Sequence, residues 1–393
     1  MRTALKDKTL NLYLEGRIDS NNATHFEKEI MDALAQASGA EIILDASALD
    51  YISSAGLRVL MKLRREAKKA LPVLNVSSEV YDIFEVTGFT ELLDVKKKLR
   101  EISIEGAELI GKGGNGAVYR LDRETIVKVY YGVSNTLEKI DRDRQVSRAV
   151  FVQGINTAIP FDVVKVGDAY GVVFEMVEAD TLGQFLTKHP EETEVYTHKM
   201  VDLLKQMHAT EFEEDALPDA RNIIYHRINI GETNGLFTHE EAAAMRAFTD
   251  SIPKRNTFVH GDYHPGNIMV KDGELILIDV GDSGLGHPIN DLMGMYLLYV
   301  IASESGSAKQ YCGLDNDAAR KLWPVILKEY FGTDDPTSYA KAIAGVATLK
   351  LMLGIAVNPS IPDEMRHGAL AKFKPAFFEN VNKPGFADIL TII

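Results

Sequence analysis

The sequence has very little cysteine and no hydrophobic run long enough to cross a membrane. Its 393 residues include a single cysteine, Cys312, which excludes an internal disulfide and any metal site built on several cysteines. The longest apolar run, 292–302 with one glycine, is shorter than the roughly 20 residues that span a bilayer. Residues 1–16 alternate polar and apolar side chains instead of forming the apolar block of a signal peptide. These absences favour a cytoplasmic location.

Charge is unevenly distributed along the chain. Residues 1–100 contain equal numbers of acidic and basic side chains, so the net charge of −14 lies entirely in the remainder. An acidic second part argues against a nucleic-acid backbone as the main partner. The composition, 46% hydrophobic and 25% charged, is that of a soluble globular protein, and the length favours at least two domains.

The first hundred residues alternate between strand and helix patterns. Leucines at 10, 12 and 14 alternate with other residues, as in a half-buried strand, whereas 26–37 and 57–67 have helical spacing. Short apolar stretches at 41–44 and 73–76 follow as strands, and 78–86 follows as a helix. This order predicts a small α/β domain with a mixed sheet over residues 1–100.

The segment 45–57, DASALDYISSAGL, resembles the phosphorylation loop of a STAS domain, the family that includes antagonists of bacterial anti-sigma factors. The resemblance extends to LEGRID at 14–19 and to YDIFEVTGFTELLDV at 81–95. It implies a protein-interaction module in which Ser54 is the possible phosphosite, although Ser53 stands where the antagonists usually have aspartate. A phosphate on Ser54 would lie at a helix start, where backbone N–H groups favour negative charge. The alternative is that Ser53 or Ser54 only caps the helix.

A glycine-rich segment opens the second part. In LIGKGGNGAVYRL, 109–121, Gly111, Gly113 and Gly116 form G-x-G-x-x-G, and Val118 follows. A dinucleotide-binding loop would open a helix, whereas 117–121 and 125–131 look like two strands. A glycine-rich hairpin over nucleotide phosphates is the kinase alternative, and an ordinary turn is the other. Strand alternation points Lys128 away from the face of its valine neighbours, where it could hold phosphates or simply lie at the surface.

The segment 259–270, VHGDYHPGNIMV, contains His260, Asp262 and Asn267 in the pattern H-x-D-x-x-x-x-N. An Asp-Gly turn follows, and a two-residue hairpin over 271–274 brings Asn267 and Asp279 to its open end. Their oxygens suit Mg²⁺, and Asp262 could accept a proton from an attacking hydroxyl. We expect His260 to pack and to hydrogen-bond. Each residue alone could be only a turn residue, but their order after a glycine loop and a strand lysine favours the functional interpretation.

This arrangement resembles the aminoglycoside phosphotransferase and choline kinase family, which shares the protein-kinase-like fold. HGDYHPGN and the later LIDVGDSGLGHPINDL, 277–292, carry the resemblance. It covers residues 104–393 and implies an α+β two-lobed domain, with a small lobe at about 104–176 and a large helical lobe at about 177–393. It also implies ATP and Mg²⁺ as cofactors.

The resemblance implies further roles. The hinge is the segment at 174–177, where the backbone of Glu175 and Val177 would bind adenine. Kinases of this fold usually pair the strand lysine with a glutamate on the following helix. Here KIDRDRQVSRAVF at 139–151 offers Asp143 near that place, so Asp143 is the possible partner of Lys128. The resemblance also makes Asp291 a structural brace of the catalytic loop.

The sequence therefore predicts an ATP- and Mg²⁺-dependent phosphotransferase that acts on a hydroxyl of a small molecule. A STAS domain is fused to it and offers a possible protein partner, and no nucleic-acid partner or membrane span is expected. One alternative is a protein-serine kinase that acts on a STAS serine, such as its own Ser54. The other is a non-catalytic nucleotide-binding scaffold.

Overall fold

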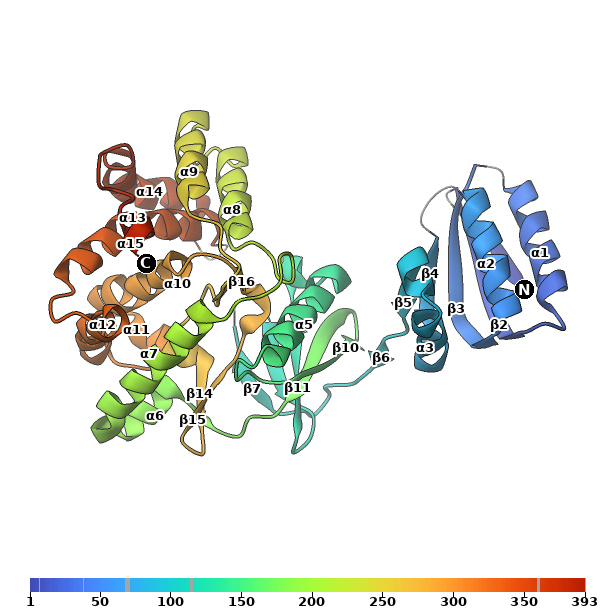
Figure 1. Cartoon of the computed structure of the whole chain (residues 1–393), viewed down its shortest axis with the longest axis horizontal. Coiled ribbons are helices and arrows are strands. Elements are labelled where there is room, and N and C mark those ends of the chain that lie inside the picture. Colours follow the sequence, from blue (N-terminus) through green and yellow to red (C-terminus); the bar gives the residue numbers. More distant parts are fainter. Residues whose placement is uncertain (7, 38, 68–70, 114–115, 359–360, 393) are drawn as a thin grey trace. The chain divides into compact units, whose positions relative to one another are not determined.

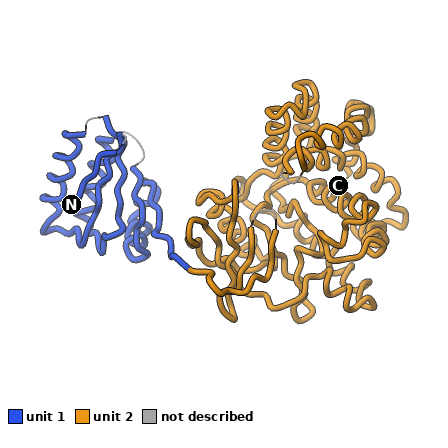
Figure 2. Tube along the Cα trace, turned by 180° about the vertical axis from the view of Figure 1, so that it is seen from behind, with its two compact units in different colours: residues 1–102 blue, residues 103–393 orange. Residues whose placement is uncertain are grey.

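The chain divides into two compact units, Met1–Ile102 and Ser103–Ile393 (Figure 2). The computed structural model describes residues 1–6, 8–37, 39–67, 71–113, 116–358 and 361–392. A separate cluster of buried apolar side chains lies in each unit, so each unit has a core of its own.

Unit 1 is an α/β domain built on a five-stranded sheet, as the sequence predicts. The strand order is β1-β2-β3-β4-β5; β1 pairs antiparallel with β2, and the other neighbours are parallel. The strands are β1 (Arg2–Lys6), β2 (Thr9–Ile18), β3 (Glu41–Ile52), β4 (Pro72–Val76) and β5 (Asp94–Lys97), and the short β6 (Arg100–Glu101) follows. The helices are α1 (Ala23–Gln36), α2 (Ser54–Ala67), α3 (Ser78–Val86) and α4 (Phe89–Leu92). Helices α1 and α2 pack side by side (Figure 1).

Unit 2 begins with an antiparallel sheet in the order β10-β11-β9-β8-β7. Its strands are β7 (Leu109–Lys112), β8 (Gly116–Arg120), β9 (Thr125–Tyr130), β10 (Pro160–Val166) and β11 (Ala169–Glu175). Helix α5 (Leu137–Val152) packs beside this sheet (Figure 1). Val127 and Val129 are fully buried on one face of β9, so the alternation inferred from the sequence is confirmed.

The rest of unit 2 is mainly helical and forms the larger part of the core. Its helices are α6 (Leu182–Lys188), α7 (Thr193–Ala209), α8 (Arg221–Thr233), α9 (His239–Ser251), α10 (Ile289–Tyr296), α11 (Ala308–Cys312), α12 (Asn316–Phe331), α13 (Thr337–Val357), α14 (Asp363–Phe378) and α15 (Ile389–Ile392). Unit 2 also contains two small sheets. One has the order β12 (Asp180–Thr181), β14 (Ile268–Lys271) and β15 (Glu274–Leu277), and the other pairs β13 (Phe258–Val259) with β16 (Gly284–Leu285).

Helix α13 is long and apolar enough, by composition, to cross a membrane, the one such helix in the described part of the chain. Its residues Ile343, Val346 and Leu349 are fully buried in the core of unit 2. Packing against α8, α10 and α14 explains its apolar composition.

Candidate active site

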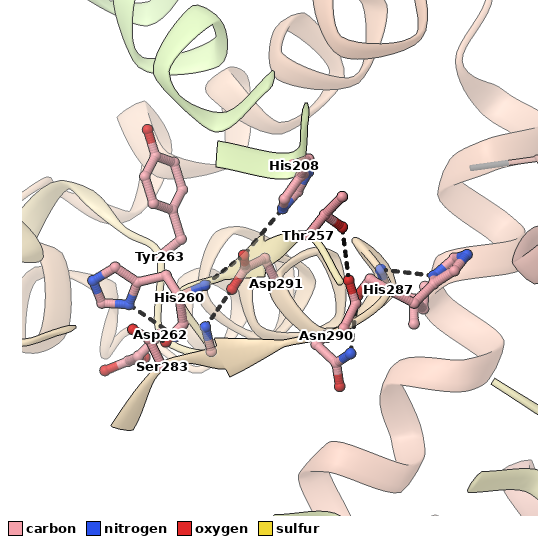
Figure 3. A network of polar contacts seen from close by, with 12 residues as sticks. His208, Thr257, His260, Asp262, Tyr263, Ser283, His287, Asn290 and Asp291 are labelled. Atoms are coloured by element: carbon pink, nitrogen blue, oxygen red, sulfur yellow. Dashed lines mark hydrogen bonds and ion pairs between the residues drawn. The ribbon is translucent and has the colours of Figure 1, made fainter. Parts of the chain in front are cut away.

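The loop after β13 is held by a buried carboxylate at the start of α10. Asp291 accepts hydrogen bonds from the backbone N–H of His260 (3.0 Å) and of Gly261 (2.5 Å), and its Oδ2 lies 3.1 Å from His208 Nε2 (Figure 3). Burial alone would raise the pKa of the Asp291 carboxyl, but the hydrogen bond and charge of His208 hold it below its usual value. Asp291 thus fixes the backbone that leads to Asp262.

Both ring nitrogens of His260 form hydrogen bonds with the backbone. Its Nδ1 accepts the backbone N–H of Asp262 (3.3 Å), and its Nε2 lies 3.2 Å from the carbonyl oxygen of Ile278. This pairing requires a neutral ring with the proton on Nε2. Ser283 also donates its hydroxyl to the His260 carbonyl at 3.1 Å. His260 therefore ties the loop to the end of β15, in keeping with the packing role expected from the sequence.

The Asp262 carboxylate remains accessible, since its side chain is 76% exposed. Its Oδ2 lies 3.5 Å from His264 Nε2 and accepts a hydrogen bond from Asn267 Nδ2 at 3.3 Å. Partial desolvation acts to raise the pKa of Asp262, but the hydrogen bond with His264 and the charge of Lys350 hold it well below its usual value. An ionised, accessible carboxylate can orient a hydroxyl and accept its proton.

Asn267 and Asp279 lie at the open end of the hairpin β14–β15. The predicted register is confirmed, because Lys271 pairs with Glu274 and the N–H of Ile278 donates to the carbonyl of Asn267 at 3.0 Å. Asn267 Nδ2 donates to the Asp262 backbone carbonyl (2.9 Å) as well as to its carboxylate, so Asn267 Oδ1 keeps its acceptor capacity. Asp279 follows in a left-handed conformation, φ 62°.

This donor set fits Mg²⁺ better than a metal that needs a full protein cage. Within the described ranges, no group of three or more His, Cys, Asp or Glu side chains could hold a metal ion. Mg²⁺ is commonly bound by one or two protein oxygens, with phosphates and water as the other ligands. Asn267 Oδ1 and the Asp279 carboxylate would supply those two oxygens.

Lys128 reaches this hairpin from β9. It stands opposite Val118 of β8 and Val172 of β11, and its ammonium forms an ion pair with the Asp279 carboxylate. The structure therefore forms two side-chain contacts, Lys128 with Asp279 and Asn267 with Asp262. The backbone hydrogen bond from Ile278 to Asn267 brings the two contacts to the same end of the hairpin.

Asp143, the possible partner of Lys128, forms no direct ion pair with it among the described residues, because Lys128 pairs with Asp279; the two residues interact only electrostatically at longer range. Asp143 instead accepts from Lys139 at 2.6 Å, and Lys139 also binds Asp282 at 2.6 Å. The reason is local, because Lys139 lies one helical turn before Asp143 on the same face of α5. Asp143 is only 4% exposed, and burial raises its pKa to about 6.

The three glycines of the G-x-G-x-x-G pattern, Gly111 in β7, Gly113 after it and Gly116 at the start of β8, have different environments. A Cβ at Gly116 would lie 2.2 Å from the carbonyl oxygen of Val129, so the strands could not approach as they do. A Cβ at Gly113 would meet nothing within 4 Å, and one at Gly111 would make only ordinary contacts. The Gly113 N–H donates to the Gly116 carbonyl at 2.9 Å and closes the loop. Glycine is thus needed at residue 116 for the close packing of β8 against β9, whereas the structure has room for a side chain at residue 113.

The two predicted hinge residues differ in what their backbone can offer. Glu175 donates its N–H to the carbonyl of Ile159 (3.0 Å), and its side chain accepts the Ile159 N–H (3.0 Å). The N–H of Met176 donates to the carbonyl oxygen of Glu124 at 2.6 Å. Among the residues that the structure describes, none hydrogen-bonds to the backbone of Val177, whose side chain is buried. Val177 therefore has the free donor and acceptor that adenine recognition needs.

Sequence reasoning missed two cations near Asp262. Lys350 of α13 donates from Nζ to the carbonyl oxygens of Gly261 (2.6 Å) and Asn290 (3.0 Å), and Arg227 of α8 interacts electrostatically with Asp282 and Asp262. A lysine within the apolar later part of α13 is the signal that could have revealed Lys350.

In unit 1, the structure separates the roles of two adjacent serines at the start of α2. Ser53 Oγ accepts a hydrogen bond from the N–H of Gly56 at 3.5 Å, and the Ser53 carbonyl oxygen accepts one from the N–H of Leu57. Ser54 is the first residue of α2 and is exposed. Ser53 thus occupies the capping position, and the Ser54 hydroxyl lies at the positive end of the helix dipole.

Two families account for the two units. Residues 106–322 match the model of the phosphotransferase enzyme family, APH, and residues 1–94 match that of the STAS domain described as Mlab. The chain belongs to the phosphotransferase enzyme family and carries an N-terminal STAS domain. It is therefore an enzyme that transfers phosphate to a hydroxyl group, as the sequence predicts.

The relatives of unit 1 are anti-sigma factor antagonists. BtrV of Bordetella bronchiseptica, described as one, is 35% identical over 92 residues, which are 23% of this chain and 78% of BtrV. The anti-sigma-B factor antagonist of Listeria monocytogenes is 24% identical over 90 residues, which are 22% of this chain and 78% of that protein.

Solved structures similar to the chain include phosphotransferases. The GDP complex of aminoglycoside 2'-phosphotransferase-IIIa has 12% identity and a TM-score of 0.43, over 76% of this chain and 98% of that chain. Choline kinase LicA from Streptococcus pneumoniae has 17% identity and a TM-score of 0.44, over 76% and 99%. Since both scores are below 0.5, family membership rests on the matched sequence.

Proposed function

We propose that this protein transfers the γ-phosphate of ATP to a hydroxyl of a small molecule, with Asp262 as the base. The observation that carries the proposal is a pair of side-chain contacts at the open end of the hairpin β14–β15. Lys128 pairs with Asp279, and Asn267 hydrogen-bonds Asp262. These residue types at one place supply a phosphate-binding cation, two metal-binding oxygens and a proton acceptor.

Each group has a distinct role in the proposed reaction. Lys128 and the backbone around Gly111, Gly113 and Gly116 bind the phosphates, with Val118 beside them, and Val177 offers its backbone to adenine. Asn267 and Asp279 would hold Mg²⁺, which when bound neutralises charge on the phosphates.

Asp262 accepts the proton of the acceptor hydroxyl as that oxygen bonds to the γ-phosphorus. The bond between the γ-phosphorus and the oxygen bridging to the β-phosphate breaks in the same transfer. ADP leaves with the electron pair of that bond, and the phosphorylated acceptor is the second product. The low pKa of Asp262 keeps it ionised before the hydroxyl arrives.

The test is ATP turnover by the full chain with a panel of hydroxyl compounds, measured as ADP release. Binding of Mg·ATP is measured separately by calorimetry. Acceptor-dependent ADP release that Asp262→Asn abolishes would support the proposal. Tight Mg·ATP binding without transfer to any acceptor would favour the non-catalytic scaffold, and absence of binding would reject both.

A second candidate is a protein-serine kinase whose acceptor is Ser54. The observation that favours it is the position of Ser54, exposed at the first turn of α2 while Ser53 occupies the cap. A STAS domain fused to a phosphotransferase would then be both partner and substrate, and the modification could regulate the enzyme.

This candidate predicts phosphate on Ser54 after incubation of the intact protein with Mg·ATP. Mass spectrometry would locate the phosphate, with Asp262→Asn as the inactive control and Ser54→Ala as the site control. Phosphate on Ser54 that depends on Asp262 would support the protein-kinase activity. An unmodified Ser54 in protein that turns over small acceptors would eliminate it.

A further inference from the structure

The peptide unit that joins Gly261 to Asp262 is held from two sides. Its carbonyl oxygen accepts a hydrogen bond from the Lys350 ammonium at 2.6 Å, and its N–H donates to His260 Nδ1 at 3.3 Å. His260 belongs to the same loop, whereas Lys350 comes from α13. The ammonium also donates to the carbonyl oxygen of Asn290 in α10 at 3.0 Å. Lys350 therefore ties this peptide unit to two helices of unit 2.

Gly261 makes this peptide unit dependent on its hydrogen bonds. Its φ is 82°, in the left-handed region, and a Cβ at this residue would meet only the carbonyl oxygen of Asp282, at 3.8 Å. Because glycine adopts a wider range of backbone conformations than other residues, hydrogen bonds rather than steric contacts restrain the rotation of the peptide unit. The bond from Lys350 is the shorter of the two and is assisted by charge, which makes a hydrogen bond roughly twice as strong. It therefore does most to fix the direction in which the Asp262 side chain leaves the backbone.

The fold leaves room for the Lys350 ammonium at this place. Outside α10, the nearest heavy atom to a Cβ at Gly294 would be Lys350 Nζ, at 2.8 Å. The next nearest would be Lys350 Cε at 3.4 Å and the Gly261 carbonyl oxygen at 3.8 Å. Glycine inside a helix is unfavourable relative to alanine, and so is a charged group in the apolar later part of α13. Both unfavourable features coincide where the ammonium reaches the Gly261 carbonyl, which indicates a requirement other than the stability of the helices.

We propose that Lys350 is a positioning residue of the phosphotransferase, which directs the Asp262 carboxylate toward the acceptor hydroxyl by holding the Gly261 carbonyl. Gly294 makes room for the ammonium. The inference rests on the proposed function and adds to it the group that orients the base. Lys350 acts through the backbone and contacts neither the nucleotide nor the acceptor. Since a displacement of about 1 Å in a reacting group can cost about 100-fold in rate, loss of this hold should slow the transfer and leave nucleotide binding unchanged.

The first test removes the ammonium. Lys350→Met keeps an unbranched side chain that ends one atom earlier and suits the apolar surroundings of α13. The full chain with Mg·ATP is assayed for ADP release with glycerol, glucose, choline and kanamycin as acceptors. We expect kcat for the fastest acceptor to fall about 10- to 100-fold, with the KM for ATP and the calorimetric Mg·ATP affinity within about threefold of the wild type. A merely structural contact would leave the kcat of the folded protein unchanged, and that result would overturn the inference.

Gly294→Ala tests the same contact without changing Lys350. Its methyl group displaces the ammonium from the Gly261 carbonyl, while alanine itself favours the helix. We expect kcat to fall about 10-fold, although the midpoint of urea unfolding, followed by tryptophan fluorescence, is not lowered. Gly354→Ala in α13, where a Cβ would meet nothing within 4 Å, is the matched control and should change neither. If Lys350→Met does not fold, Gly294→Ala decides alone, and a wild-type kcat in that variant overturns the inference.

A double variant tests whether Lys350 acts through Asp262. Residues that act as a unit have strongly non-additive effects, so Lys350→Met should lower the residual kcat of Asp262→Asn by less than about threefold. Single-turnover measurements at high enzyme concentration follow this slow reaction. A further loss as large as that caused in the wild type would show that Lys350 acts independently of Asp262 and would overturn the inference.

Hydrogen exchange of the full chain, measured by mass spectrometry without ligands, tests the hold on the loop independently of any acceptor. We expect the backbone N–H groups of residues 260–262 to exchange at least about 10-fold faster in Lys350→Met and Gly294→Ala than in the wild type, the effect of losing one charge-assisted hydrogen bond. Gly354→Ala should match the wild type. If no acceptor reacts, this comparison decides, and equal exchange in all of these proteins overturns the inference. Failure of the proposed function is distinct, because it is an absence of ADP release or of Mg·ATP binding in the wild type itself.

Discussion

The Lys128 ammonium forms an ion pair with the Asp279 carboxylate, although 151 residues separate them in the sequence. Lys128 comes from the middle of β9, and Asp279 follows β15 in a left-handed conformation. The pair joins the group that we assign to ATP phosphates with one that we assign to Mg²⁺. Lys128 contacts Oδ1 of the Asp279 carboxylate. The other oxygen, Oδ2, can bind the metal while the ion pair persists, or the ion pair can break when Lys128 binds the nucleotide phosphates.

We expect Asp279→Asn to weaken Mg²⁺-dependent ATP binding by at least about 10-fold, because a neutral amide attracts the metal less than a carboxylate does. Calorimetric titration with and without Mg²⁺ measures the effect. Asp272→Asn, in the exposed hairpin turn at φ 51°, is the matched control and should bind normally. Unchanged affinity and turnover in Asp279→Asn would remove Asp279 from the metal site.

Asp262→Asn should leave Mg·ATP affinity nearly intact but lower turnover by about two to four orders of magnitude, the usual contribution of a general base. The amide preserves the shape of the side chain and loses the proton acceptor. Steady-state ADP release and calorimetry on the same preparation separate the two effects. A folded variant with wild-type turnover would contradict the assignment of Asp262 as base.

Gly116→Ala and Gly113→Ala form a matched pair within the glycine-rich segment. The added methyl at residue 116 would meet the Val129 carbonyl at 2.2 Å, whereas at residue 113 it meets nothing within 4 Å. We expect Gly116→Ala to destabilise unit 2 by about 1–3 kcal/mol and Gly113→Ala to leave its stability unchanged. Urea unfolding followed by tryptophan fluorescence reports unit 2 alone, since Trp323 is the single tryptophan of the chain. Equal stability of the two variants would show that the strands can separate freely at residue 116.

Asp143 should make the stability of unit 2 depend on pH. Its pKa in the folded protein is about 6, above the ordinary value of 3.8, so the unfolded chain releases this proton first. The contribution of Asp143 to stability therefore falls as pH rises from about 4 to 6 and stays low above that. The Asp143→Asn variant lacks this pH dependence. Its free energy of unfolding should exceed that of the wild type by an amount that grows to about 3 kcal/mol across this window.

Urea unfolding at pH 4.5 and 7.5, followed by Trp323 fluorescence, measures this difference. Asp141→Asn is the control on the same helix, because Asp141 is less buried and pairs with Arg144 at 2.9 Å. The same pH dependence in all three proteins would show that Asp143 is not the titrating group.

Local sequence patterns were sufficient to predict several features of the fold. The Asp-Gly turn set the register of β14 and β15, since a two-residue hairpin leaves one way to pair the flanking residues. Strand alternation oriented Lys128 away from Val127 and Val129. Helical spacing of leucines placed α2, whose Leu57 and Leu60 are buried. The backbone repeats of strands and helices act over a few residues, so the sequence alone can determine these features.

Tertiary structure alone decided which distant groups meet. The sequence offered Asp143 to Lys128, but Lys139 lies one turn away from Asp143 and pairs with it, and Asp279 reaches Lys128 from another segment. Lys350 and Arg227 were not recognised in the sequence, because their approach to the catalytic loop depends on how α13 and α8 pack. Periodicity shows which face of an element a residue occupies. The partner that it finds depends on the packing of elements far apart in the chain, because side-chain ion pairs and hydrogen bonds form only over a few ångströms.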